Sequence, residues 1–153
     1  PLVNIDGHVI GINTAVAADG AENIGFAIPI DDVRGMIASV VESGKLVRPY
    51  LGVRYITLNE GVASELGIEQ KTGAYIVEGS PDEPSILENS PASKAGLQAR
   101  DVIIAVNNEA IDNRHTLTSL LSKRKVGDKV KLKVVRDGKE IEIKVQLEAL
   151  PEN

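Results

Sequence analysis

The strongest constraint on the fold is a regular alternation of apolar and polar residues near the C-terminus. Apolar side chains alternate with lysines over residues 130–135 and with polar side chains over residues 141–147. Asp137-Gly138 lies between the two runs, and this dipeptide is a strong signal for a tight turn. The pattern predicts a β-hairpin with one apolar face. Because an isolated hairpin is marginally stable at best, other elements must cover that face.

The residues before this hairpin supply those elements. The predicted elements are strands at residues 51–56, 73–78 and 102–106, a helical turn at 60–66, and helices at 90–95 and 113–123. Ser90-Pro91 is typical of a helix start, because proline fits the first helical position. Residues 50–148 therefore predict a complete α+β domain, a small antiparallel β-sandwich or barrel with two helices.

The first 43 residues predict elements that do not complete a domain. They read as a hairpin turning at Asp6-Gly7, a loop at 17–23, a short strand at 24–28, and a helix. The helix shows one apolar stripe at helical spacing, formed by Val33, Met36, Ile37, Val40 and Val41. Asp31 or Asp32 is expected to cap its start and Gly44 its end. So small a unit cannot bury its apolar faces alone. Residues 1–43 are therefore expected to be the last part of a larger domain, followed by a linker at 44–49.

Composition excludes several functions. The chain has 153 residues, a net charge of −5, three Tyr and one Phe, so a nucleic-acid surface is not expected. No cysteine is present, which excludes disulfides and thiolate metal sites. The longest uncharged stretch, residues 7–18, is too short to span a membrane. Four carboxylates in the loop 78–88 permit a cation site, but a solvated loop is favoured, and we expect no metal and no cofactor. The chain opens on Pro1 in mid-pattern and is expected to be a fragment.

Two sets of residues resemble known families. The first set resembles a bacterial PDZ domain and comprises Gly73-Ala74, Asn89-Ser90-Pro91-Ala92-Ser93-Lys94-Ala95-Gly96-Leu97, Asp101-Val102-Ile103, Val106-Asn107 and Ile111. The second set is similar to the end of the protease domain of trypsin-like HtrA/Deg-type serine proteases and comprises Pro1-Leu2-Val3-Asn4, Gly7, residues 9–15 and residues 24–29. Together they cover nearly the whole chain in the order of that family. The implied domains are a protease remnant at 1–43, a PDZ domain at 50–148 and a tail at 149–153.

The resemblance implies a peptide-binding groove. Its carboxylate-binding loop falls on Tyr50, Leu51, Gly52 and Val53. Its groove residues are Arg54, Tyr55 and Ile56 on the strand, with Leu117 and Leu121 on one face of the helix. An incoming peptide adds a strand beside residues 53–56, and its last side chain enters the apolar pocket. The alternative to pocket lining for Leu117 and Leu121 is plain core packing. Arg48 either attracts the ligand carboxylate or is solvated, and a solvated arginine is favoured.

The resemblance also implies what this chain lacks. In the family, the catalytic His, Asp and Ser lie upstream of Pro1, and here the only histidines are His8 and His115. Neither has a serine and a carboxylate placed for nucleophile activation. For His115 an exposed histidine is favoured, and the alternative is a bond to a ligand hydroxyl. Ile12, Asn13 and Thr14 are implied to be a remnant of the protease specificity pocket. The chain alone is expected to be inactive.

The expected function is recognition of peptide C-termini or unfolded segments within an HtrA-like serine endopeptidase of protein quality control. The family implies a periplasmic or cell-envelope location and a parent that is a homotrimer or a multiple of one. The alternatives are a non-catalytic PDZ adaptor and the PDZ domain of another protease type. One departure from the family pattern is Arg100, which stands where glycine is usual before Asp101. If that position needs positive φ, arginine strains the turn.

Overall fold

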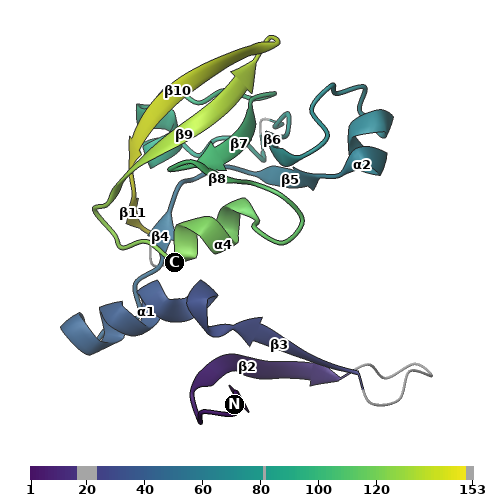
Figure 1. Ribbon diagram of the computed structural model, residues 1–153. Coiled ribbons are helices and arrows are strands. Elements are labelled where there is room, and N and C mark those ends of the chain that lie inside the picture. The colour runs from purple at the N-terminus through teal and green to yellow at the C-terminus, as the bar shows by residue number, and fades with distance from the viewer. Residues whose placement is uncertain (17–23, 81, 151–153) are drawn as a thin grey trace.

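The computed structural model describes residues 1–16, 24–80 and 82–150. In chain order the elements are β1 (Leu2–Val3), β2 (Val9–Val16), β3 (Gly25–Pro29), α1 (Ile30–Ser43), β4 (Pro49–Tyr50), β5 (Tyr55–Leu58), α2 (Glu60–Glu65), β6 (Gly73–Ile76), α3 (Pro91–Lys94), β7 (Val102–Val106), β8 (Glu109–Ala110), α4 (Leu117–Ser122), β9 (Lys129–Arg136), β10 (Lys139–Gln146) and β11 (Glu148–Ala149). Figure 1 shows two parts, with β1–β3 and α1 below and the remaining elements above. Each of these helices is too short or too polar to cross a membrane. The predicted loop at 17–23 lies outside the described residues.

The larger part is built on an antiparallel sheet in the order β10-β9-β7-β6-β5, with β8 paired to β7. The predicted hairpin is confirmed: β9 and β10 pair along their full length, and Asp137 and Gly138 both take positive φ in the turn. Along β9, buried apolar residues alternate with exposed lysines. They join one core cluster with residues of α3, α4 and the other strands. The α+β class is therefore confirmed, and β5 is left as an edge strand.

The smaller part is a three-stranded sheet, β1-β2-β3, followed by α1. Its apolar side chains remain exposed, as expected for an incomplete core, and Phe26 is 57% exposed. The cap prediction for α1 was wrong at its start. Pro29 is the N-cap and no side chain caps the helix, so Asp31 and Asp32 lie in the first turn. Gly44 ends the helix in a left-handed conformation, as predicted.

The two parts are joined by close backbone packing. Helix α1 lies beside α4 (Figure 1). Gly35 faces the end of α4, where an added Cβ would lie 2.5 Å from the carbonyl oxygen of Ser122 and 2.6 Å from that of Arg124. An ion pair between Glu42 and Lys125 spans the same junction. The contact therefore depends on the absence of a side chain at one helical position.

Two element boundaries differ from the prediction. The strand predicted at 51–56 begins only at Tyr55, because residues 51–53 form a loop held by other segments. The helix predicted at 113–123 is confined to Leu117–Ser122, because Thr116 caps it through a hydrogen bond from the Ser119 N–H. Before that cap, the Asp112 carboxylate holds the backbone in a turn.

The pairing of β4 with β11 was not predicted, and it brings Pro49 beside Ala149. The strain expected at Arg100 is present, since its φ is +70°.

Candidate functional site

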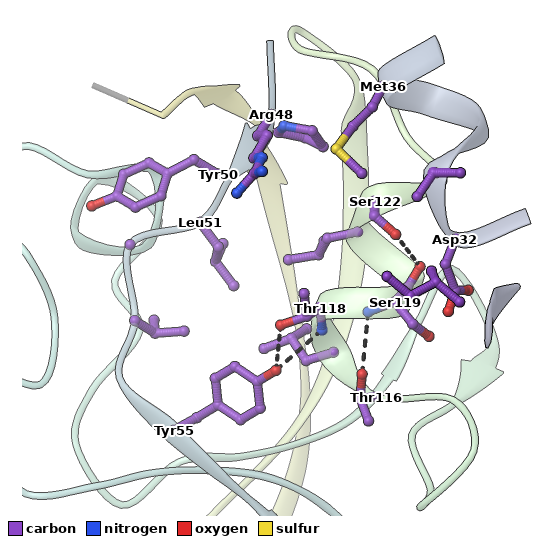
Figure 2. Close-up of a pocket in the computed structure, with 17 residues that line it drawn as sticks. Asp32, Met36, Arg48, Tyr50, Leu51, Tyr55, Thr116, Thr118, Ser119 and Ser122 are labelled. Atoms are coloured by element: carbon purple, nitrogen blue, oxygen red, sulfur yellow. Dashed lines mark hydrogen bonds between the residues drawn. The ribbon is translucent and has the colours of Figure 1, made fainter. Parts of the chain in front are cut away.

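A groove of about 530 Å³ opens between the loop before β5, helix α4 and helix α1 (Figure 2). Its lining residues are Ile28, Asp32, Val33, Met36, Arg48, Pro49, Tyr50, Leu51, Gly52, Val53, Tyr55, Thr116, Leu117, Thr118, Ser119, Leu121 and Ser122. The lining is mostly apolar, with hydroxyl groups along α4, an arginine from the linker and an aspartate from α1. This composition suits a ligand with apolar side chains and a few fixed polar groups.

The loop Leu51-Gly52-Val53 presents unpaired backbone donors. The carbonyl oxygen of Leu51 accepts from the Ala92 N–H, and that of Gly52 accepts from the Leu87 N–H. Within the described part of the chain, the N–H groups of Leu51, Gly52 and Val53 donate no hydrogen bond. Leu51 and Gly52 are buried, and unpaired N–H groups in such a place are costly unless water or a ligand accepts from them. Converging N–H groups of this kind bind anions.

The loop keeps its shape because a neighbouring helix start braces it. Gly52 has φ +85°, and an added Cβ would lie only 2.3 Å from the Cβ of Ser90. Ser90 is buried and caps α3 by accepting a hydrogen bond from the Ser93 N–H. Only glycine satisfies both the backbone angle and this close approach. Burial raises the pKa of the neighbouring Tyr50 phenol, which keeps this side chain neutral.

The predicted pocket leucines serve both the core and the groove. Leu51, Leu117 and Leu121 are buried members of the main core cluster, and each also lines the groove. Val53 is half-buried against the same cluster. Core packing and pocket lining are therefore not alternatives here, because one face of the core is the floor of the groove.

Strand β5 supplies one wall of the groove but not all its predicted residues. Tyr55 lines the groove, and its hydroxyl lies 2.6 Å from the Thr118 hydroxyl and accepts from the Thr118 N–H (Figure 2). Arg54 and Ile56 do not line it, since side chains alternate along a strand. Arg54 instead forms an ion pair with Glu83. The backbone of Arg54 is also occupied, because its N–H donates to the Ser85 carbonyl oxygen and its carbonyl oxygen accepts from the Val77 N–H.

Helix α1 is a part of the site that sequence reasoning missed. Asp32, Val33 and Met36 line the groove together with residues of the larger part. The apolar stripe predicted for this helix contains Val33 and Met36, but no part in a binding site was predicted for it. The rest of that stripe is exposed, with Val41 at 80%. The hydroxyl groups of α4 were also missed, because nothing in their spacing distinguishes a groove from solvent.

The remaining predicted residues lie apart from the groove. Ile12, Asn13 and Thr14 are exposed on β2, and the Thr14 hydroxyl donates to the Phe26 carbonyl oxygen. His115 does not line the groove, and its ring contacts the Asp112 carboxylate at 3.1 Å. Backbone N–H groups of the residues that follow Asp112 lower the pKa of its carboxyl. Among the described residues, no group of His, Asp and Glu side chains is arranged to hold a metal ion.

Comparison with known proteins identifies the larger part. The PDZ domain family model matches residues 49–147. The chain is 38% identical to the serine protease Do-like HtrA of Bacillus subtilis over 97% of its length, and 35% identical to the periplasmic serine endoprotease DegP of Escherichia coli over 99%. It spans about a third of the length of these relatives.

The solved structures agree with these relatives. The HtrA-type protease AlgW, solved with a decapeptide, matches with a TM-score of 0.67 and 26% identity, over 96% of this chain and 44% of that one. The resemblance to HtrA/Deg-type proteases is thereby confirmed along both parts of the chain. The chain belongs to the PDZ domain family, and nearly all of it is similar to one segment of HtrA/DegP-type serine proteases.

Proposed function

We propose that the groove binds the free C-terminus of a peptide or protein. The terminal carboxylate accepts hydrogen bonds from the N–H groups of Leu51, Gly52 and Val53. The peptide runs antiparallel to β5 as an added strand. Its last side chain enters the apolar floor formed with Leu117 and Leu121.

The observation that carries this proposal is that the carbonyl and N–H groups of the loop backbone differ in their hydrogen bonding. The carbonyl groups of Leu51 and Gly52 hold the loop in place, whereas the N–H groups of Leu51, Gly52 and Val53 have no acceptor within the described residues. The edge position of β5 supports the same mode of binding, because an edge strand has unpaired backbone groups along one side. The related protease AlgW, solved with a decapeptide, is consistent with a peptide ligand. Arg48 at the groove adds a positive charge that favours an anionic terminus, and Asp32 on α1 adds a negative charge to the same lining.

Isothermal titration calorimetry tests the proposal directly. A heptapeptide ending in leucine is titrated into the chain as the free acid and, separately, as the C-terminal amide. Amidation removes charge-assisted hydrogen bonds, so the amide is expected to bind about ten- to hundredfold more weakly. Equal affinity for the two peptides would exclude the carboxylate loop.

The whole protein is proposed to be a serine endopeptidase, as the names of its relatives suggest. A role in protein quality control is proposed from the family resemblance. The sequence given contains no candidate triad, since His8 and His115 are its only histidines. We therefore expect the 153-residue chain to leave casein intact. Casein cleavage that a serine-directed inhibitor blocks would contradict this. The adaptor and the other protease types remain less favoured, because the relatives match through β1–α1 as well as through the PDZ domain.

Three further expectations belong to the same proposal. The envelope location is supported by relatives named periplasmic. The proposal that the parent is a homotrimer or a multiple of one rests on family resemblance. The division into a protease part at 1–43, a linker at 44–49, a PDZ domain at 50–148 and a tail is supported by the separation of the three-stranded sheet from the six-stranded sheet. The pairing of β4 with β11 joins Pro49 of the linker to Ala149 of the tail. Limited proteolysis that cuts first within 44–49 would support this division, and first cuts inside 50–148 would oppose it.

A further inference from the structure

Strand β10 forms the second edge of the main sheet. It ends the order β10-β9-β7-β6-β5 and has eight residues, Lys139–Gln146. Within the described residues, β10 pairs only with β9. It runs along the outer margin of the larger part (Figure 1), and none of its residues lines the groove. An edge of this length needs an explanation, because its unpaired backbone groups can bond another strand.

The backbone groups at this edge belong to the even-numbered residues of β10. Residues that flank a two-residue turn form a hydrogen-bonded pair, and Arg136 and Lys139 are such a pair. The pairing continues along both strands without a shift in register. The odd-numbered residues of β10 therefore direct their N–H and carbonyl groups at β9, and the even-numbered residues direct theirs outward.

The side chains of β10 differ between its two faces. Ile141 and Ile143 are half-buried against the main core cluster, and Val145 is buried in it. Helix α3 belongs to the same cluster and contacts β10. The other face carries the exposed side chains of residues 140, 142, 144 and 146. A strand added at this edge would cover the exposed parts of the two isoleucines.

The charges on the outer face are not balanced within one copy. Lys144 lies directly opposite Lys131 on β9, and like charges in opposite positions are destabilising. Lys131 forms an exposed ion pair of 3.4 Å with Glu142. In the described part of the chain, Lys144 has no ion-pair partner. A carboxylate placed beside Lys144 from outside would offset the repulsion between the two lysines.

We propose that β10 pairs with β10 of a second copy of this chain, antiparallel about a two-fold axis at Ile143. In that register Glu142 of each copy lies opposite Lys144 of the other, and Ile141 lies opposite Val145. An axis at Glu142 would oppose two glutamates, and an axis at Lys144 would oppose two lysines. Of the axes from Ile141 to Lys144, only Ile143 joins opposite charges without opposing like ones. The contact is self-complementary, so it closes at two copies.

A cysteine at the proposed axis tests this pairing in the 153-residue chain. The sequence has no cysteine, so Ile143→Cys introduces a single thiol. Two such thiols would face each other in a pair with Cα atoms about 4.5 Å apart, within reach of a disulfide. Ile141→Cys is the matched control, because it lies on the same face but its two copies would be about 14 Å apart. After mild oxidation, nonreducing electrophoresis is expected to show a covalent dimer for Ile143→Cys and a monomer for Ile141→Cys.

Charge reversal in the Ile143→Cys background tests the register. Lys144→Glu and Glu142→Lys each oppose two pairs of like charges, so each is expected to lower the yield of covalent dimer about tenfold. An equimolar mixture of the two variants places opposite charges together again, and its yield is expected to recover. Glu140→Lys is the matched control, because residue 140 lies opposite the neutral Gln146 in this register. Its yield is expected to stay within twofold.

Each outcome decides the inference. Far-UV circular dichroism checks that the variants fold, as expected for exposed positions. The pairing is wrong if Ile143→Cys cross-links no better than Ile141→Cys. The register is wrong if Lys144→Glu cross-links as well as Glu140→Lys, or if the mixture stays monomeric. Peptide titrations do not enter this test, since β10 lies apart from the groove, so failure of the proposed function would leave the pairing standing.

Discussion

Replacing Gly52 by alanine tests whether the conformation of the loop creates the binding site. The substitution carries two separate costs. Positive φ of +85° costs an L-residue about 1–2 kcal/mol. The new Cβ would also lie 2.3 Å from the Ser90 Cβ and 2.7 Å from its hydroxyl oxygen, well inside van der Waals contact. Ser90 is buried and caps α3, so moving it costs about 1 kcal/mol more.

Gly96→Ala is the matched control for this substitution. Gly96 also has positive φ, +77°, but an added Cβ would meet nothing within 4 Å. It should therefore show the backbone cost of about 1–2 kcal/mol without the collision. Urea unfolding is expected to show that Gly52→Ala is destabilised by about 2–3 kcal/mol. The difference between the two losses in the free energy of unfolding measures the cost of the collision with Ser90, and so how firmly that contact holds the loop.

The peptide affinities of the same two variants test whether binding needs the loop conformation. Gly52→Ala displaces the N–H groups that are proposed to hold the carboxylate, so its affinity for the leucine-ended peptide is expected to fall at least tenfold. Gly96 does not line the groove, and its variant is expected to bind as the wild type does. The reasoning is refuted if both variants lose the same stability, or if Gly52→Ala retains full affinity for the free acid.

Three other substitutions or titrations test the framework around the site. Asp101→Asn should lower the free energy of unfolding in urea by about 3–5 kcal/mol. The reason is that Asp101 is fully buried and accepts two hydrogen bonds of 2.7 Å from Arg136. A loss below about 1 kcal/mol would contradict a buried ion pair. Arg100→Gly should raise stability by about 1 kcal/mol by relieving φ +70°, and an unchanged or lower thermal midpoint would speak against strain there. The carboxyl of Asp112, followed by NMR, should titrate below its ordinary pKa of 3.8. Its contribution to the free energy of unfolding is therefore present at and above pH 3.8 and is lost as the pH falls through the lowered pKa. Titration at or above 3.8 would disprove the hydrogen bonds from the backbone.

Much of the fold was predictable because its signals are local. The alternation of β9 and β10 fixes which face is buried, and Asp137-Gly138 fixes the turn between them. Ser90-Pro91 marks the start of α3 in the same way. The incomplete core of residues 1–43 follows from size alone, and the structure leaves those apolar faces exposed.

The less predictable features depend on contacts between distant segments. Strand β5 starts four residues later than the strand predicted at 51–56, because the Arg54 N–H donates to the Ser85 carbonyl oxygen and the Gly52 carbonyl oxygen accepts from the Leu87 N–H. Helix α4 is shorter than its pattern because Thr116 competes as a cap. Neither the pairing of β4 with β11 nor the hydroxyl-rich wall of the groove has a local sequence signal.

The candidate site also combines features with a local sequence signal and features that depend on contacts between distant segments. The sequence by itself predicted a loop at Leu51–Val53 in which glycine leaves the backbone open to close approach. The need for glycine also depends on Ser90, which is distant in the chain and would collide with an added Cβ. It also determined which leucines face inward on α4. Only the tertiary structure decided that α1 closes the groove. That contact depends on Gly35 fitting against the carbonyl groups of Ser122 and Arg124, nearly ninety residues away, and close packing between two such surfaces leaves no periodic trace in either segment.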